Sequence, residues 1–314
     1  MEILRTPDER FAALPTDGPD GFPYEARYVE VPAGDGSGSL RVGYVEAGPA
    51  DGPVVLLLHG EPTWSYLYRS LLPVLAERGF RAVALDLVGF GRSDKPTQVA
   101  DHSYARHVEW VRAAVFDALD LTDVTLVGQD WGGLLGLRLA TENPDRFAAI
   151  VAANTGLPTG DHPMPDVWWA FRSAVETAPV LDIGRLVASG CRAGLSDAAR
   201  AAYDAPFPDE TYKAGPRAMP LILPTTPEDP ATAANRMAWQ RLTEWRKPFL
   251  VAFSDSDPIT GPMAPILTRA IPAASAQDNP TIAGAGHFLQ EDAGPELATA
   301  VADFLTAAGR GPAT

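Results

Sequence analysis

The sequence has little cysteine, few basic residues and no long apolar run, and each shortage excludes a class of protein. One cysteine, Cys191, excludes an intramolecular disulfide and a metal site built from several cysteines, and it suits the reducing cytoplasm. No apolar run approaches the roughly 20 residues that span a membrane, and no apolar leader follows Met1. Lysine and arginine number 25 against 40 aspartates and glutamates, and the net charge of -15 argues against nucleic acid or an anionic membrane as a partner.

A chain of 314 residues is long enough for one large α/β domain with an insertion, and 46% apolar and 21% charged residues are typical of an ordinary soluble globule. Apolar or alternating runs alternate with helical patterns, which predicts a mostly parallel, doubly wound sheet flanked by helices. Eight strands are expected, at 24–31, 40–46, 53–58, 81–87, 124–129, 147–153, 249–253 and 281–283. In such a sheet, sites form at the carboxyl ends of the strands.

Between residues 156 and 245 the strand patterns disappear. Helical segments broken by proline take their place at 167–177, 183–189, 198–203 and 236–245, and tryptophan and phenylalanine are frequent. We interpret 156–245 as a helical cap domain inserted over the catalytic edge of the sheet. Residues 1–155 and 246–314 would then form the core domain.

The most informative stretch runs from the apolar segment 124–127 into the pattern Gly128-x-Asp130-x-Gly132. Glycines on both sides of Asp130 predict a strand that turns at once into a helix, a strained elbow that exposes its central side chain. A carboxylate is already ionised at neutral pH and needs no base to act as a nucleophile. It can displace a leaving group from saturated carbon and form an alkyl ester. The alternative is an aspartate that only caps a helix.

A base and an orienting acid follow in the chain order of the hydrolase elbow fold. His287 comes after the last predicted strand and is the candidate base for the water that would hydrolyse the ester. Asp257 follows the strand 249–253 and is favoured as the acceptor of the imidazole N–H, with Asp255 as the rival. Asn154 ends another predicted strand, but an amide cannot replace the acid, so we expect only a polar contact from it.

Two backbone N–H groups are candidates for an oxyanion hole. They belong to Trp131, directly after Asp130, and to Glu61 in the turn that begins at His59. His59 itself is expected to stabilise this turn rather than to take part in catalysis. The indole N–H of Trp131 is a donor with no acceptor function and would suit a departing halide, or the ring could simply form a cavity wall.

Four segments resemble the haloalkane dehalogenases of the α/β-hydrolase superfamily: HGEPTWSYLYR (59–69), DLVGFGRSDKP (86–96), GQDWGG (128–133) and GAGHFLQE (284–291). With the acid at Asp257, the chain is most similar to the subfamily whose acid follows the seventh strand. The resemblance implies an α/β-hydrolase fold and hydrolysis of a carbon–halogen bond to alcohol, halide and a proton, with no cofactor and no metal. It also implies that Asp130 is the nucleophile, His287 the base and Asp257 the acid, and that Trp131 binds the halide.

In that subfamily a second tryptophan, from the cap, also binds the halide. The cap here offers Trp168, Trp169 and Phe171. Counting back from Pro179 places Phe171 at the donor position, whereas a small shift in register places Trp168 or Trp169 there. We favour Trp168, since Phe171 would leave the halide without this N–H donor. The expected partners are a small apolar halogenated substrate, water and halide, bound by a monomer or a small homo-oligomer.

Two other functions fit parts of the same pattern. An epoxide hydrolase shares the fold and the aspartate nucleophile, but it needs an acid for the alkoxide, and Tyr203 or Tyr212 of the cap could supply one. Gln129 and Glu61 argue against this alternative, because epoxide hydrolases more often carry histidine and phenylalanine at these places. A non-catalytic binder of small apolar ligands is the other alternative, and the complete set of nucleophile, base and acid argues against it.

Overall fold

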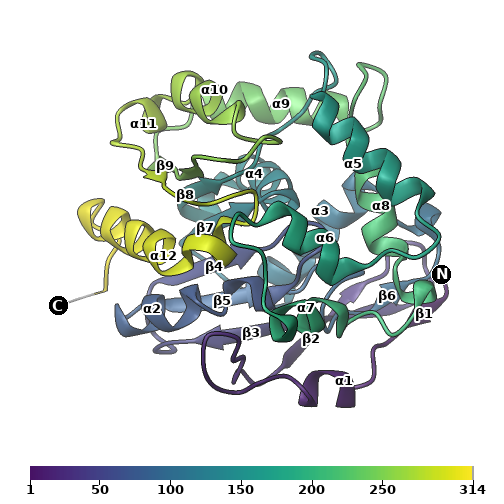
Figure 1. The fold of residues 1–314 in the computed structure, drawn as a ribbon. Helices are drawn as coiled ribbons and strands as arrows, with labels where there is room; N and C mark the ends of the chain where they lie inside the picture. Colours follow the sequence, from purple (N-terminus) through teal and green to yellow (C-terminus); the bar gives the residue numbers. More distant parts are fainter. Residues whose placement is uncertain (313–314) are drawn as a thin grey trace.

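A computed structural model describes residues 1–312, and Figure 1 shows a twisted sheet covered by helices. Within these residues the largest sheet has seven strands, in the order β2 (Arg27–Pro32), β3 (Ser39–Ala47), β5 (Arg81–Leu85), β4 (Val54–Leu58), β7 (Val124–Gln129), β8 (Phe147–Ala153) and β9 (Phe249–Val251). β2 and β3 form an antiparallel hairpin, and β3 is also antiparallel to β5. From β5 to β9 the neighbouring strands are parallel, which confirms the mostly parallel α/β sheet.

The predicted eighth strand is present as β11 (Thr281–Ile282), but it does not extend the large sheet. It pairs in parallel with β10 (Phe253–Ser254), which follows β9 after Ala252. The Ala252 N–H donates to the Ala152 carbonyl oxygen of β8 at 2.9 Å, so the chain still follows β8 at that point. Only the next two residues turn to β11. In the described part of the chain the large sheet therefore has seven strands rather than eight, and β10 and β11 form a separate ladder.

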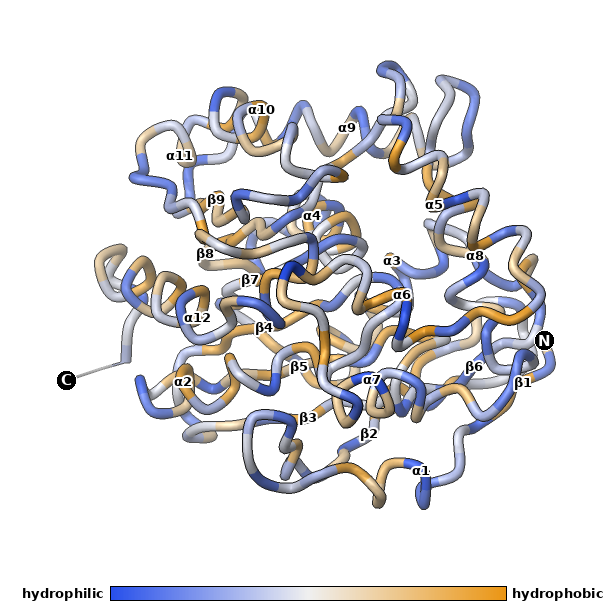
Figure 2. Tube along the Cα trace, in the orientation of Figure 1, coloured by the Kyte–Doolittle hydropathy of each residue, from blue (hydrophilic) through white to orange (hydrophobic). Residues whose placement is uncertain are grey.

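The central strands are buried on both faces, which explains why they are continuous apolar runs in the sequence. Every residue of β7 and β8 is buried, and in β4 only Val54 is partly exposed. Figure 2 shows orange stretches gathered along these strands, with blue stretches more common at the periphery. Because helices cover the faces of the sheet, the carboxyl ends of the strands are the part that can form a site.

Helices pack in pairs on the two faces of the sheet. α2 (Leu71–Glu77) lies against α12 (Leu289–Ala307), and α3 (Tyr104–Arg112) lies against α4 (Trp131–Glu142) on the face that is fainter in Figure 1. α12 has a non-helical break at Ala293, where Pro295 has no N–H to donate to the preceding turn. None of the helices within residues 1–312 combines the length and the apolar character needed to span a bilayer.

The segment between β8 and β9 is helical, as predicted. Its elements are α5 (Asp166–Thr177), α6 (Ile183–Gly190), α7 (Asp197–Asp204), the short 3-10 helix η5 (Glu210–Tyr212), α8 (Ala214–Ile222) and α9 (Thr232–Thr243). The sequence did not indicate α8, because Pro216 and Pro220 resemble turn residues. Pro216 falls in the first turn of α8, where its missing N–H would have no helical partner. The division into a core and a cap domain stays a prediction, and residues 313–314 of the predicted core lie outside the described part.

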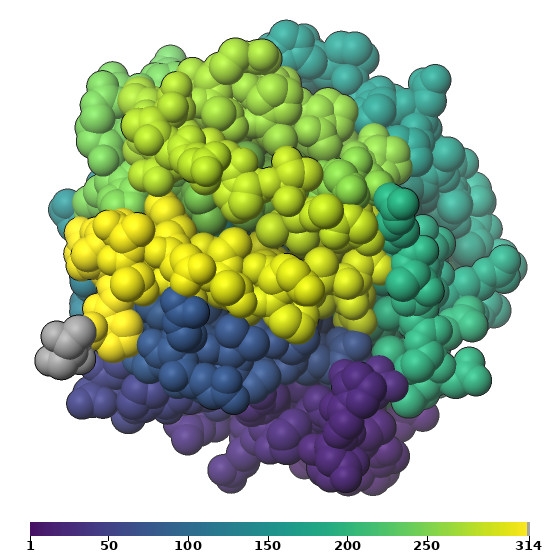
Figure 3. Space-filling model, turned by 60° about the vertical axis from the view of Figure 1, so that its left-hand side comes forward, coloured from purple at the N-terminus to yellow at the C-terminus, as the bar shows by residue number. Residues whose placement is uncertain are grey.

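A polar cluster ties this helical segment to the rest of the molecule. Arg69 donates through Nη2 to the Glu291 carboxylate at 2.7 Å, and the Tyr203 hydroxyl of α7 donates to the same carboxylate. The Arg69 and Glu291 side chains are only 9% and 2% exposed. In Figure 3 the yellow C-terminal part borders both the blue segment around α2 and the green helical segment. Tyr203 is thus an anchor between α7 and α12.

Candidate active site

The residue at the predicted elbow has a strained backbone. Asp130 lies between β7 and α4 with φ +50° and ψ -126°, a conformation that residues other than glycine rarely adopt. A Cβ atom on Gly132 would lie 1.9 Å from the Leu58 carbonyl oxygen, and one on Gly128 would lie 2.7 Å from the Gly133 Cα. Only glycine fits at positions 128 and 132. Because both are glycine, the chain can turn this tightly and present the Asp130 carboxylate at the open edge of the sheet.

The Asp130 carboxylate meets a different partner on each oxygen. The Glu61 N–H donates to Oδ1 at 2.8 Å, and Oδ2 lies 3.5 Å from His287 Nε2. The next N–H along the chain, that of Trp131, is at the first residue of α4 and has no acceptor within the helix. The two N–H groups predicted for an oxyanion hole therefore belong to the residues that flank this carboxylate, and the start of a helix favours its negative charge.

The structure brings His287 between Asp130 and Asp257. His287 Nδ1 lies 3.0 Å from Asp257 Oδ2, and the backbone N–H two residues after Asp257 donates to its other oxygen at 2.8 Å. Asp255, the rival acid, lies at the surface and accepts a hydrogen bond from the Gly284 N–H at 2.9 Å. Of the two aspartates in this loop, Asp257 is the one that reaches the ring.

The charges around His287 favour its protonated form in the resting site. Burial lowers the pKa of His287, but the carboxylates of Asp257 and Asp130 outweigh that effect and raise the pKa well above its ordinary value. Burial raises the pKa of Asp257, yet the positive ring and hydrogen bonds lower it overall. Neutralising Asp130 would therefore remove one of the two charges that keep the ring protonated.

Two amide side chains hold the backbone of His287. Asn154 Nδ2 donates to the His287 carbonyl oxygen at 3.0 Å and to that of Gly286 at 2.9 Å, which is a polar contact of the kind expected. Gln129 Nε2 donates to the same His287 oxygen at 3.2 Å. The sequence interpretation missed the Gln129 contact. The available signal was the position of Gln129 at the carboxyl end of β7, directly before Asp130.

His59 and Glu61 both lie buried in the turn after β4. The Leu87 N–H donates to His59 Nε2 at 2.9 Å, and His59 Nδ1 lies 2.8 Å from the Gly60 carbonyl oxygen, so this ring joins two loops. Burial raises the pKa of Glu61 well above its usual range, and the negative charge of Asp130 raises it further. Both effects favour the protonated form of the Glu61 side chain, the form that does not repel the Asp130 carboxylate.

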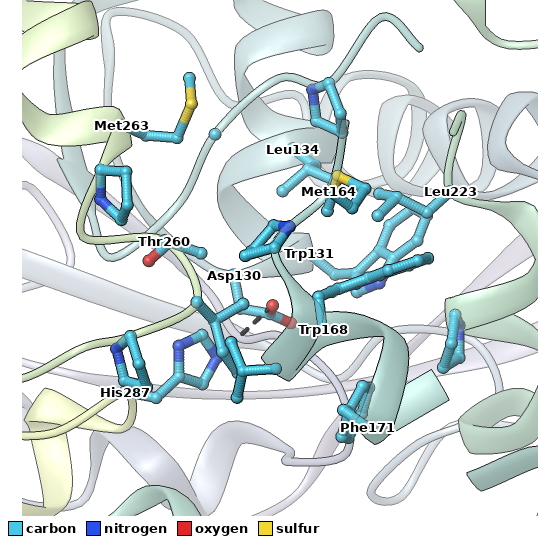
Figure 4. A pocket seen from close by; sticks show the side chains of 18 of the residues that line it. Asp130, Trp131, Leu134, Met164, Trp168, Phe171, Leu223, Thr260, Met263 and His287 are labelled. Atoms are coloured by element: carbon cyan, nitrogen blue, oxygen red, sulfur yellow. Dashed lines mark ion pairs between the residues drawn. The ribbon is translucent and has the colours of Figure 1, made fainter. Parts of the chain in front are cut away.

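A cavity of about 1270 Å³ opens over Asp130 and His287, and most of its wall is apolar. Its wall includes α5 and α10 (Met263–Ala270), a helix absent from the prediction. Figure 4 shows Trp168 on the opposite side of Asp130 from His287, with Trp131 close by and Phe171 farther along α5. Trp168 is 5% exposed, whereas Trp169 is 44% exposed and does not line the cavity.

The indole N–H groups of Trp131 and Trp168 are free to meet a ligand in this cavity. The corresponding groups of Trp64, Trp110 and Trp239 donate to backbone carbonyls. Within residues 1–312 the indoles of Trp131 and Trp168 donate no hydrogen bond to the protein, and both side chains line the cavity. Two unpaired donors in an apolar wall suit an anion that gains little from protonation, such as a halide.

Neither tyrosine considered as an acid for epoxide opening lines the cavity in the described part of the chain. The Tyr203 hydroxyl is buried against Glu291, and burial beside that carboxylate raises the Tyr203 pKa. Tyr212 lies in η5, outside the cavity wall. Neither tyrosine is therefore placed to donate a proton to an epoxide oxygen in this cavity.

Known proteins are similar to this chain over nearly its whole length. A family model described as the alpha/beta hydrolase fold matches residues 53–294. A haloalkane dehalogenase of Mycobacterium marinum is 51% identical over 298 residues, covering 95% of this chain and 98% of that protein. One of Psychrobacter cryohalolentis is 49% identical, covering 97% and 98%. Among solved structures, the tetrameric haloalkane dehalogenase DpaA of Paraglaciecola agarilytica matches with a TM-score of 0.86 and 37% identity, covering 96% of this chain and 97% of that chain.

Proposed function

Because this chain belongs to the haloalkane dehalogenases of the α/β-hydrolase fold, we propose that Asp130, His287 and Asp257 hydrolyse the carbon–halogen bond of a small apolar haloalkane. One observation carries the proposal. The Asp130 carboxylate, the His287 ring and the Asp257 carboxylate form a line with separations of 3.5 Å and 3.0 Å beside an apolar cavity. The products are an alcohol, a halide ion and a proton, and Asp130 supplies the nucleophile without a metal or a cofactor.

In the first step an oxygen of the Asp130 carboxylate attacks the carbon that bears the halogen. The new C–O bond forms as the C–halogen bond breaks, and the electron pair of that bond leaves with the halide. Oδ1 is held by the Glu61 N–H, which leaves Oδ2 as the attacking oxygen. The halide is received by the indole N–H groups of Trp131 and Trp168, which act strongly because the cavity is apolar.

In the second step water cleaves the ester on Asp130. Esterification removes the negative charge of Asp130, so the pKa of His287 falls and more of the ring is neutral and able to accept a proton. The water oxygen attacks the Asp130 Cγ, its proton passes to His287 Nε2, and Asp257 stabilises the imidazolium. The N–H groups of Glu61 and Trp131 stabilise the oxyanion. Collapse of this intermediate releases the alcohol, restores the carboxylate and leaves one proton for solvent.

The helical segment completes the site in this proposal. Residues 156–245 act as a cap domain that supplies Trp168 and Phe171, whereas the core domain, 1–155 and 246–314, supplies the nucleophile, the base and the acid. The partners are the halogenated substrate, water and the halide. We propose a monomer or a small homo-oligomer, and the tetrameric relative supports the second.

The direct test is release of halide and acid from short bromoalkanes, with epoxides of matching length assayed alongside. We expect halide and protons in equal amounts from the bromoalkanes and no diol from the epoxides, because Tyr203 and Tyr212 do not reach the cavity. A halide electrode and a pH-stat measure the two products. Diols without halide would contradict the proposal in favour of an epoxide hydrolase. Binding of bromoalkanes without turnover would favour a binder.

The Trp168→Phe variant tests the second halide donor. Loss of one N–H to an anion should lower kcat/KM for bromoalkanes about 10- to 100-fold, which corresponds to roughly 1.5–3 kcal/mol for a hydrogen bond to a charged group. Bromide binding, followed by tryptophan fluorescence, should weaken as well. Trp169→Phe is the matched control, because this neighbouring side chain is outside the cavity, and it should keep the wild-type values. Unchanged bromide binding in Trp168→Phe would exclude Trp168 as the donor.

A further inference from the structure

Gln129 is a buried amide directly before Asp130, and no step of the proposed mechanism uses it. Its side chain has no exposed surface and does not line the cavity. Gln129 Nε2 lies 3.3 Å from His287 Nε2 and also donates to the His287 backbone oxygen at 3.2 Å. One amide nitrogen thus contacts both the proton-accepting atom of His287 and the backbone that carries the ring.

The orientation of this amide is determined by its surroundings. If the amide turned over, Gln129 Oε1 would face the His287 backbone oxygen, and two acceptors would meet without a proton between them. In the observed orientation Oε1 is buried with no hydrogen-bond partner among residues 1–312. An unpaired buried acceptor is costly, so the contacts of the nitrogen with His287 must compensate for it.

The contact between Gln129 and the His287 ring depends on the charge of the ring. Asp257 Oδ2, an acceptor, lies 3.0 Å from Nδ1, so Nδ1 carries a hydrogen and the neutral ring has a lone pair at Nε2. The Gln129 N–H can meet that lone pair. If Nε2 is also protonated, two donors face each other. The amide therefore favours the neutral ring, whereas the carboxylates of Asp257 and Asp130 favour the charged one.

We propose that Gln129 is a positioning residue for ester hydrolysis, one that holds the His287 ring in its neutral, proton-accepting form by donating to its Nε2 and to its backbone oxygen. The proposal rests on the function of His287 as the base. Its effect is largest in the second step, when Asp130 is esterified and only Asp257 still favours the charged ring. Because the contact of 3.3 Å is long, a water molecule that approaches Nε2 can take over the lone pair.

The test is the pH dependence of ester hydrolysis, separated from halide release by quenching single turnovers and following the alkylated protein by mass spectrometry. Gln129→Glu places a carboxylate oxygen opposite Nε2 and reverses the preference. The acidic limb is the pH range in which the hydrolysis rate falls because His287 becomes protonated. We expect its midpoint to rise by about one pH unit, so that hydrolysis at the pH of the wild-type midpoint slows several-fold. Gln129→Met only removes the donor, so the midpoint of its acidic limb should rise by a smaller amount. This variant should still release the first equivalent of halide.

Gln290→Met is the matched control. Gln290 is another buried glutamine, 1% exposed, with neither side-chain polar atom paired in the described part of the chain, and it lies outside the cavity wall. Its variant should keep the wild-type limb. The proposal is overturned if both Gln129 variants slow halide release and ester hydrolysis by the same factor at every pH and the acidic limb of the hydrolysis rate stays where it is in the wild type. That result would mean that Gln129 only packs against its neighbours. If Gln129→Glu does not fold, Gln129→Met decides. Failure of the proposed function is a different outcome, because the wild type and Gln290→Met would then release no halide.

Discussion

In the His287→Phe variant, a bromoalkane should release one equivalent of bromide per active site and then almost none. Asp130 still receives the Glu61 N–H and can be alkylated. The ester then persists because the general base is missing, and loss of such a base slows a step by about 10²- to 10⁴-fold. Rapid-quench bromide assays should show the burst. Intact-protein mass should rise by one alkyl group, and peptide mapping should locate it on Asp130.

A second variant, His287→Gln, is needed in case His287→Phe lowers the stability of the fold. Removing one partner of a buried charged pair costs about 3–5 kcal/mol, although Asp257 keeps a backbone N–H and the Thr260 hydroxyl as donors. Glutamine retains a donor towards Asp257 but is not a base. Repeated turnover by both variants would exclude His287 as the base. A missing burst in both folded variants would exclude the assignment of His287 to the second step alone.

Replacing Asp130 by alanine should abolish both steps. Neither bromide release above about 10⁻⁴ of the wild-type rate nor a gain in mass is expected, because in the proposed mechanism Asp130 supplies the attacking oxygen. The fold should persist, since the turn depends on backbone contacts that alanine keeps. Among these is the hydrogen bond from the Thr155 hydroxyl to the backbone oxygen of residue 130, at 2.7 Å. Bromide assays, intact mass and circular dichroism check the three parts of this result.

Asp255→Ala is the control for the Asp130 variant. It removes another carboxylate from the same edge of the molecule, but one that lies at the surface and does not reach His287. Its bromide release should stay close to the wild-type rate. Wild-type turnover by Asp130→Ala would rule out the alkyl ester, and with it the two-step mechanism.

The fold and the elbow could be predicted because their causes are local in sequence. Strands buried on both faces must be apolar throughout, and the run before Gly128 has this character. Glycine is needed where a Cβ would collide with neighbouring backbone, as at Gly128 and Gly132. His287 and Asp257 were proposed for the site because each follows a strand, and parallel strands bring their carboxyl ends to one edge.

Other features depend on contacts that sequence spacing does not determine. Asp255 and Asp257 are two residues apart in one loop, and only the path of that loop decides which one meets the ring. Trp168 and Trp169 are neighbours on one helix and point in different directions, so an error of one residue changes which of them enters the cavity, whereas Phe171 lies three residues after Trp168 on the same face and also lines it. Gln129 meets His287 across 158 positions of the chain, and nothing near Gln129 in the sequence indicates that partner.

Two buried hydrogen bonds tie α7 to the segments around Trp64 and Glu291. The Tyr203 hydroxyl donates to the Glu291 carboxylate, and the Trp64 indole donates to the Ala202 carbonyl oxygen at 3.1 Å, so lifting α7 would break two buried hydrogen bonds. Breaking the one to the charged group alone costs roughly 1.5–3 kcal/mol. The pair of Arg236 and Asp161 beside the cavity is about 40% exposed, and such surface pairs contribute about 1 kcal/mol or less. Opening the cavity by moving the Arg236 and Asp161 side chains should therefore cost less free energy than opening it by lifting α7.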